Sequence, residues 1–308
     1  MRSHRFGTMM IVLLATMALA SCGEAGAAAL DAQAIGKAAG TKATVSDGAV
    51  RIGWTRSDVV VTVDGMPLPP SAGLGSWAAF QTTGQGDEAI VMGDTVLFQD
   101  EVDAAMDAAL EHGLTVTALH NHFFFDEPRV FYMHLGGRGP AARLAGGVKE
   151  VWDAVRRVRA ARPQPARRFS GPVPVAGGRL DAGRLESITG LKAKAQPGGV
   201  VKVGTGRTAS MHGVEVGGAL GLTSWAAFTG SDARAVIDGD LIMAANEVQP
   251  VLRALRRAGL HVVALHNHMI GEQPPLFFTH FWGMGPAADL AGDFKAALQA
   301  QARSDGEK

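Results

Sequence analysis

Two spacings of apolar residues alternate along the chain, and each predicts a different element. Alternation with β-branched residues predicts strands, and apolar residues three or four positions apart predict helices that bury one face. Strands are expected at 59–63, 77–80, 89–92, 114–122 and 130–135. Helices are expected at 30–39, after Asp100 and after Pro140, because aspartate suits an N-cap and proline suits a first helical turn.

The same succession of elements occurs a second time. The matching segments are Ser-Trp-Ala-Ala-Phe at 76–80 and 224–228, Gly-Asp at 93–94 and 239–240, and Gly-Pro-Ala-Ala at 139–142 and 285–288. Asn246 takes the place of Asp100, so a second N-cap is expected there. Such a long internal repeat indicates a duplicated domain. The predicted fold is therefore α+β: a tandem duplication of a domain with a mainly antiparallel sheet and two or three helices, the copies being related by a pseudo-two-fold axis.

Composition changes divide the chain into six segments. The repeats are expected at 30–158 and 180–302, joined by a linker at 159–179 that is rich in arginine, proline and glycine. A signal peptide at 1–21, a tether at 22–29 and a tail at 303–308 complete the division.

The N-terminus has the features of an export signal. Arg2 and Arg5 precede an apolar run at 8–20, which is too short to span a membrane comfortably. The run ends in Leu-Ala-Ser-Cys at 19–22, which resembles a lipobox, and Cys22 is the only cysteine. We therefore predict cleavage before Cys22, lipidation of its thiol, and a lipoprotein anchored in a membrane of the cell envelope, outside the cytoplasm.

Composition adds one exclusion. Lys plus Arg and Asp plus Glu balance at 29 each among 308 residues, whereas nucleic-acid binders usually carry a basic excess. Nucleic acid is therefore not an expected partner, and a small molecule or another envelope component is expected instead. Apolar residues make up 47% of the chain, which is ample for a core.

Six of the ten histidines fall in one duplicated pattern. Each repeat carries Ala-Leu-His-Asn-His followed twelve positions later by a third histidine; the two sets are His120, His122 and His134, and His266, His268 and His280. Residues two apart on a strand share a face, about 6.6 Å apart. A turn centred on Glu127 would place His134 on the neighbouring strand, directly across from His120 or diagonal to it on the same face.

Three imidazoles on one face predict a transition-metal site. Zinc binds histidine nitrogens at about 2.0–2.1 Å, and three protein ligands leave a position for water. Asp126, Glu127 and Glu272 are candidates for a carboxylate ligand, a ligand-orienting group or a general base. Zinc is the expected ion, with iron, manganese and copper as alternatives once a carboxylate takes part. Asp94 and Asp240 follow glycines and are expected in turns.

Two functional interpretations follow. A metal-binding lipoprotein, with metal-dependent hydrolysis as its expected chemistry, is supported by the duplicated spacing. A non-catalytic ligand-binding or scaffold lipoprotein with structural histidines is supported by the absence of a G-x-S-x-G elbow, a P-loop or an H-E-x-x-H motif. Aromatic residues flank both histidine sets; strand aromatics are usually core, and a stacking wall for a ring-shaped ligand is the alternative.

The recurring motifs resemble the LppY/LpqO family of uncharacterised bacterial lipoproteins. The resemblance is carried by Ser-Trp-Ala-Ala-Phe, Gly-Asp, the Ala-Leu-His-Asn-His segments and the third histidine, and it covers essentially the whole mature chain. It implies a lipid-anchored envelope protein built from two repeats. Residues 127–129, Glu-Pro-Arg, follow the family pattern, whereas residues 273–275, Gln-Pro-Pro, depart from it.

Overall fold

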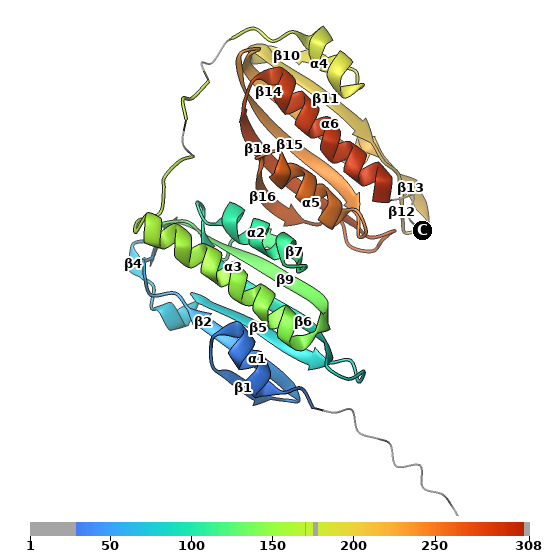
Figure 1. Ribbon diagram of the computed structural model, residues 1–308. Helices are drawn as coiled ribbons and strands as arrows, with labels where there is room; N and C mark the ends of the chain where they lie inside the picture. Colours follow the sequence, from blue (N-terminus) through green and yellow to red (C-terminus); the bar gives the residue numbers. More distant parts are fainter. Residues whose placement is uncertain (1–28, 170, 175–177, 305–308) are drawn as a thin grey trace, which may run out of the picture.

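The computed structural model describes residues 29–169, 171–174 and 178–304, and shows two α+β repeats that share one long sheet (Figure 1). In the first repeat the helices are α1 (Ala32–Ala39), α2 (Val102–Glu111) and α3 (Ala141–Ala161). Its strands are β1 (Ala43–Ser46), β2 (Ala49–Thr55), β3 (Thr62–Val63), β4 (Met66–Pro67), β5 (Gly75–Thr82), β6 (Glu88–Phe98), β7 (Thr115–His120), β8 (Asp126–Glu127) and β9 (Val130–Pro140), with a 3-10 turn, η1 (Pro70–Ala72).

The second repeat has the same plan. Its helices are α4 (Ala182–Thr189), α5 (Val248–Arg257) and α6 (Ala287–Ser304), with 3-10 turns η2 (Pro197–Gly199) and η3 (Gly218–Leu220). Its strands are β10 (Lys194–Gln196), β11 (Val200–Gly206), β12 (Ala209–Met211), β13 (Val214–Val216), β14 (Thr223–Ser231), β15 (Arg234–Ala244), β16 (His261–His266), β17 (Glu272–Gln273) and β18 (Leu276–Gly285). Among the described residues, no helix has the length and apolar character needed to cross a membrane.

The main sheet has twelve strands in the order β1-β2-β5-β6-β9-β7-β16-β18-β15-β14-β11-β10. The second half of this order repeats the first half in reverse, which is what a pseudo-two-fold axis between β7 and β16 produces. Neighbouring strands pair antiparallel. The predicted fold class, an antiparallel α+β duplication with two or three helices in each repeat, is confirmed, and the described part of each repeat has three.

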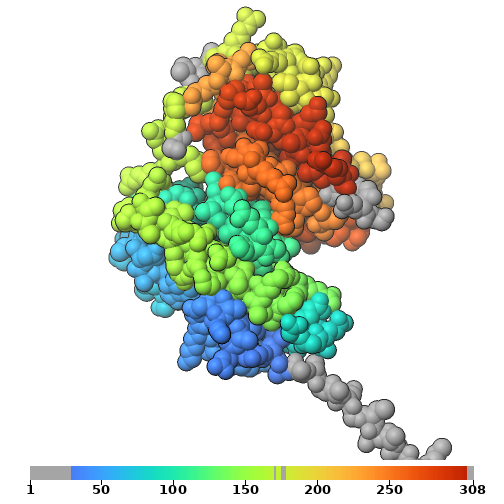
Figure 2. Space-filling view, viewed as in Figure 1, coloured from blue at the N-terminus to red at the C-terminus, as the bar shows by residue number. Residues whose placement is uncertain are grey.

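The helices cover one face of the sheet and lie in front of it in Figures 1 and 2. Strand β9 shows how the two faces differ, because its successive side chains point to opposite sides. Met133 and Leu135 belong to the large core beneath the helices, whereas Val130 and Tyr132 belong to a second, smaller core. His134 has the parity of Val130 and Tyr132, so it lies on the helix-free face.

The smaller core lies beneath a three-stranded sheet, β4-β3-β8, which covers part of the helix-free face. The strand predicted at 59–63 is wrong in length: only Thr62–Val63 is a strand. Val59 and Val61 are instead buried against Val96 and Phe98 of the main sheet, so packing explains their alternation. The second repeat has the equivalent sheet, β13-β12-β17.

The helix ends partly follow the predicted caps. The α1 helix was expected from residue 30 but begins at Ala32, because the Asp31 carboxylate caps it by accepting hydrogen bonds from two backbone amides. It ends where expected, with Gly40 in the left-handed region at φ 64°. The expected N-caps Asp100 and Asn246 are wrong, because α2 and α5 begin one residue later, after Glu101 and Glu247.

Asp100 and Glu101 have other roles near the start of α2. The carboxylate of Asp100 pairs with Arg159 and accepts a hydrogen bond from the Ala166 amide at 2.9 Å. The fully buried Glu101 carboxylate accepts bonds from Arg56 at 2.7 and 3.0 Å and from the Phe98 amide at 2.8 Å. Both side chains therefore connect the start of α2 to distant segments of the chain.

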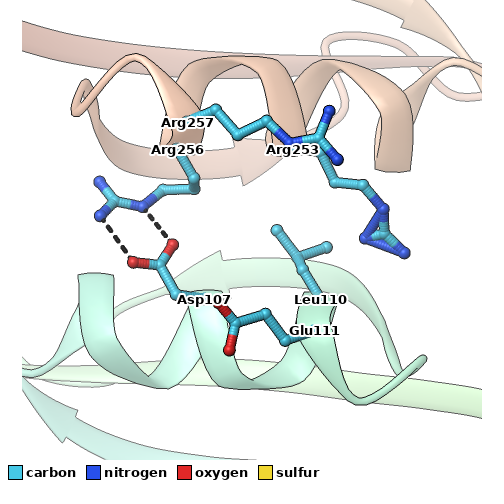
Figure 3. A pocket seen from close by; sticks show the side chains of 6 residues that line it. All are labelled: Asp107, Leu110, Glu111, Arg253, Arg256 and Arg257. Atoms are coloured by element: carbon cyan, nitrogen blue, oxygen red, sulfur yellow. Dashed lines mark hydrogen bonds and ion pairs between the residues drawn. The ribbon is translucent and has the colours of Figure 1, made fainter.

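The repeats meet along β7 and β16 and along α2 and α5. Leu119 pairs with Leu265 across the two strands. Where the strands diverge, the Gln249 side chain bonds both the amide and the carbonyl of Val116, at 3.0 and 2.8 Å. On the helix side Arg256 forms a bidentate pair with Asp107 at 2.8 and 3.1 Å (Figure 3). The Leu119–Leu265 pairing and the Gln249 hydrogen bonds continue the sheet across the junction, and the Arg256–Asp107 pair joins the helices that cover it.

Candidate functional site

The histidines of repeat one converge on the helix-free face. His120 ends β7, His122 follows two residues later, and His134 lies on β9. The pairing places Ala118 opposite His134 and His120 opposite Tyr132, with a bulge between Val116 and Ala118. His120 and His134 are therefore diagonal neighbours on one face rather than directly opposed residues.

The distances suit a shared ligand position. The Nε2 atoms of His120 and His134 lie 3.1 Å apart, and the His122 ring centroid lies 5.1 Å from that of His120. Two nitrogens bound tetrahedrally to zinc at 2.0–2.1 Å would be about 3.3 Å apart. One ion could therefore bridge the His120 and His134 nitrogens with little movement of either ring.

A carboxylate completes the cluster, and the turn predicted for it is wrong. Asp94 lies inside β6, directly opposite His134, not in a turn. Its Oδ2 is 3.7 Å from the His134 Nε2, whereas its Oδ1 is buried and has no hydrogen-bond partner within the described part of the chain. A buried carboxylate oxygen without a partner is costly, and a cation is one way to compensate it.

The second repeat builds the same cluster with a different closest pair. Asp240 lies opposite His280 on β15 and β18, and its Oδ1 is also buried without a partner among the described residues. The ring of His266 is 5.1 Å from those of both His268 and His280. Here it is His268 that approaches the carboxylate, with Nε2 3.7 Å from Oδ2. Between them, the repeats show that the carboxylate can approach both the strand histidine and the loop histidine.

Burial sets the protonation states in both clusters. It lowers the pKa values of His120, His122, His266 and His268 below the ordinary range, and neighbouring imidazoles lower them further. These rings are therefore neutral at pH 7, the form that binds metal. Burial also raises the pKa of Asp94, against the opposing effect of the nearby histidines. Burial likewise raises the pKa of Asp240, and the neighbouring Asp238 carboxylate raises it further.

The outermost histidine of each cluster packs on an aromatic ring. His122 stacks on Tyr132 at 3.3 Å between centroids, and His268 stacks on Phe278 at 3.4 Å. The Tyr132 hydroxyl donates to the Gly73 carbonyl at 2.7 Å, which fixes that ring. Across the described residues, no group of three or more His, Cys, Asp or Glu side chains is already gathered as an ion would require. Ion binding would therefore need side chains in both clusters to move, although the stacked His268 ring already lies 3.7 Å from the Asp240 carboxylate.

The carboxylates proposed from the sequence lie in the loops that follow each histidine pair. Asp126 accepts a hydrogen bond from the Val130 amide at 2.5 Å, and Glu272 accepts one from the Leu276 amide at 2.9 Å. Glu127 is exposed and lies 3.4 Å from Arg167. These contacts give Asp126 and Glu272 a place in local backbone structure; a ligand or base role for the three residues stays a prediction.

Aromatic residues near the clusters divide between core and surface. Phe278 and Phe281 are buried, whereas Phe124 and Phe125 are 83% and 80% exposed. Trp77 and Trp225 lie opposite Asp94 and Asp240, so each flanks a cluster on the helix-free face. Arg51 lies 4.2 Å from the Trp77 ring centroid, and Lys202 lies 3.9 Å from that of Trp225.

A signal for the missed aspartates was present in the sequence. Each aspartate has apolar residues on both sides within one strand, and each follows a glycine. The glycine reflects close packing rather than a turn. A Cβ at Gly93 would lie 2.7 Å from the Trp77 carbonyl oxygen, and one at Gly239 would lie 2.2 Å from the Phe281 ring.

The fold and the clusters together define a class: tandem α+β repeat proteins in which each repeat carries three histidines and one buried aspartate on an open sheet face. The family model described as Domain of Unknown Function (DUF1259) matches the chain twice, over residues 33–154 and 183–300. The chain belongs to this family.

No curated protein matches the chain by sequence. Among solved structures, one similar chain is a double-ringed trimeric shell protein of the RMM microcompartment, 12% identical, with 70% of this chain and 83% of that chain covered. Its TM-score is 0.19, so this likeness carries no argument about function.

Proposed function

We propose that each repeat binds one divalent transition metal ion, zinc first among the candidates. The ligands would be His120, His122, His134 and Asp94 in repeat one, and His266, His268, His280 and Asp240 in repeat two. The observation that carries the proposal is the buried, unpartnered carboxylate oxygen beside three imidazoles, present in both repeats. The same carboxylate oxygen, Oδ1 of Asp94 and of Asp240, lacks a partner in both repeats, which supports a ligand common to the two copies.

The donor set fits this assignment chemically. Neutral imidazoles and a carboxylate bind zinc, and a histidine-carboxylate set also suits iron, manganese or copper. A divalent ion would compensate the desolvated charge of Asp94 and Asp240, whose raised pKa values reflect that cost. The His134 side chain is 44% exposed, so the solvent side of the site stays open to water or a ligand.

Metal-dependent hydrolysis is the reaction class that such an open site supports. A bound ion would lower the pKa of a coordinated water and generate a nucleophile near neutral pH. Asp126, Glu127 and Glu272 are the proposed bases from sequence. Since the two buried ones already accept backbone hydrogen bonds, Glu127 is the most available of the three.

Metal analysis tests the proposal. The mature protein, purified without chelator or affinity metal, is expected to contain two equivalents of metal by elemental mass spectrometry. His120→Ala/His122→Ala should leave one equivalent, and adding His266→Ala/His268→Ala should leave none. His112→Ala, a change of an exposed histidine outside both clusters, is the matched control and should keep two. Metal-free protein that takes up no zinc, manganese, iron or copper would overturn the proposal.

The extracytoplasmic location is proposed from the sequence alone. Cys22 and the export signal lie outside the described residues, and the finer assignment to the LppY/LpqO lipoproteins rests on the motifs quoted above. The anchor predicts that the protein fractionates with membranes and incorporates a radioactive fatty acid. It also predicts that Cys22→Ser loses both the label and the membrane association. If Cys22→Ser still fractionates with membranes as the parent protein does, lipidation of Cys22 is not what anchors the protein.

A second function has an observation of its own. The stacks of His122 on Tyr132 and of His268 on Phe278 suit a non-catalytic ligand-binding or scaffold lipoprotein in which the histidines are structural. His122→Phe/His268→Phe separates the two functions. If the histidines are structural, the variant keeps the stability and ligand binding of the parent protein. If they bind metal, the variant loses metal affinity at least tenfold.

A further inference from the structure

The two clusters lie next to each other on one continuous face, although their sequences are far apart. Strands β7 and β16 pair through Leu119 and Leu265. Continuing this antiparallel register by one residue places His120 opposite Ala264 and Ala118 opposite His266. Since the register fixes these positions, they do not depend on side-chain rotamers.

Two rows of residues therefore cross the junction in opposite directions. The first row runs from repeat one into repeat two as Trp77, Asp94, His134, Ala118 and His266. The second runs the other way as Trp225, Asp240, His280, Ala264 and His120. Each row holds the carboxylate and strand histidine of one repeat and ends at a histidine of the other.

This arrangement sets the separation of the two proposed ions. His120 and His266 are diagonal neighbours on adjacent strands, so their backbones lie roughly 7–8 Å apart. The rings of His120 and His134 meet over β7 and β9, and those of His266 and His280 meet over β16 and β18. Two inter-strand spacings separate these positions, which is about 10 Å.

Only small side chains lie between the two clusters. Ala118 and Ala264, the residues between the strand histidines in the two rows, are the smallest side chains that an L-residue offers. Beyond the clusters, Arg51 and Lys202 lie over the flanking tryptophans and add positive charge at both ends of the face. A ligand across the junction would therefore meet metal at two points and cations beyond them.

Ion pairs on the opposite, helix-covered face of the sheet hold the two repeats together. Arg256 of α5 pairs with Asp103 at 2.7 Å and with Asp107 of α2 at 2.8 Å, and His261 pairs with Asp103 at 2.6 Å. Figure 3 shows the Arg256–Asp107 pair bridging the two helices beside a groove of about 410 Å³. These contacts hold β7 against β16 from the helix side, so they also hold the spacing of the two clusters.

We infer, on the basis of the proposed metal binding, that the two centres form one composite site across the repeat junction. Its ligand is a dianion with a metal-coordinating oxyanion group at each end, such as a linear dicarboxylate. Two divalent ions with Asp94 and Asp240 leave two net positive charges, which such a ligand neutralises. At about 10 Å the ions are too far apart to share one water, since two-metal hydrolytic pairs lie at about 3.5–4 Å.

Metal–metal distance tests the geometry. The mature chain is loaded with two equivalents of Cu²⁺, and dipolar broadening is measured by continuous-wave electron paramagnetic resonance. The expected result is strong coupling at a separation of about 10 Å, absent from His266→Ala/His268→Ala, which keeps one ion. Two bound ions without coupling, at more than about 15 Å, would overturn the composite site and leave the metal proposal standing. No bound copper, zinc or manganese would overturn the metal proposal itself.

Ligand length tests the chemistry. Binding of malonate, succinate, adipate and suberate to the zinc-loaded chain is measured by calorimetry, with acetate as the single-ended control. The expected result is one ligand per two ions, an affinity optimum within the series, and at least tenfold tighter binding than acetate. Disabling either cluster should reduce the best dicarboxylate to the acetate level, whereas His112→Ala should not. Two ligands per chain, or no dependence on length, would overturn the bridging ligand.

Discussion

Asp94 lies directly across strands β6 and β9 from His134, with its Oδ2 3.7 Å from the imidazole Nε2, and Asp240 stands in the same register opposite His280. This cross-strand pair organises each candidate site. The strand pairing fixes the carboxylate against one histidine, and the diagonal neighbour on the next strand brings a second imidazole. The third histidine lies beyond the end of the strand and stacks on an aromatic ring, and in repeat two it also approaches the carboxylate.

Asp94→Asn should stabilise the metal-free protein while weakening metal binding. The buried carboxylate has an unpartnered oxygen, and burial raises its pKa, so the folded protein disfavours the charged form at neutral pH. Removing that charge is expected to gain on the order of 1 kcal/mol, or roughly 2–4 °C in Tm. Calorimetry without metal measures the gain, and zinc titration measures at least a tenfold loss of affinity at that site. A destabilised metal-free variant would contradict this account.

Asp126→Ala should lower stability without changing metal content. Its carboxylate accepts a hydrogen bond from the Val130 amide at the start of β9. Losing that bond in a buried position is expected to cost about 1–3 kcal/mol of folding stability. Glu127→Ala is the matched control: the residue is exposed and its ion pair lies on the surface, so the change should stay within about 0.5 kcal/mol. Urea unfolding and elemental analysis check both. Loss of metal in Asp126→Ala would return Asp126 to the ligand set.

The histidine cluster was predictable because strand parity is strict. Residues two apart on one strand share a face, and the register of the hairpin, with Ala118 opposite His134, places His120 on that same face. The one-residue shift at the bulge lies between Val116 and Ala118, beyond the histidines, so it does not separate them. The carboxylate was not predictable by the same rule. Asp94 follows a glycine, and Gly-Asp usually signals a turn, so only its place inside an apolar segment argued for a strand.

Local rules failed where long-range contacts decide the outcome. Asp100 is a favourable N-cap by sequence, but its carboxylate binds Arg159 and the Ala166 amide, residues far along the chain. Val59 and Val61 alternate as in a strand, yet a second sheet that packs on the first buries them without strand pairing. The junction between β7 and β16 likewise needs both repeats, so no pattern within one repeat could predict that the two clusters are neighbours.

Glu101→Ala should be strongly destabilising. The residue is fully buried and holds the guanidinium of Arg56, which is also fully buried, through two hydrogen bonds. Removing Glu101 leaves Arg56 paired with Asp58 alone and Arg159 paired with Asp100 alone, so two buried guanidinium groups each lose a carboxylate, at a cost of roughly 3–5 kcal/mol. Glu111→Ala, an exposed glutamate at the other end of the same helix, should change stability by less than about 0.5 kcal/mol. Guanidinium-chloride unfolding compares them, and equal effects would contradict the prediction.

Arg256→Gln should loosen the junction while leaving each cluster intact. The side chain joins α5 to Asp103 and Asp107 of α2, so its loss is expected to cost about 1–3 kcal/mol and to let β7 and β16 separate. Arg257→Gln is the control on the same groove, because Arg257 is exposed and forms no ion pair within the described part of the chain. In copper-loaded protein both variants should keep two ions, but only Arg256→Gln should lose dipolar coupling. Undiminished coupling in Arg256→Gln would mean that strand pairing alone, without the helix-side ion pairs, holds the two centres in register.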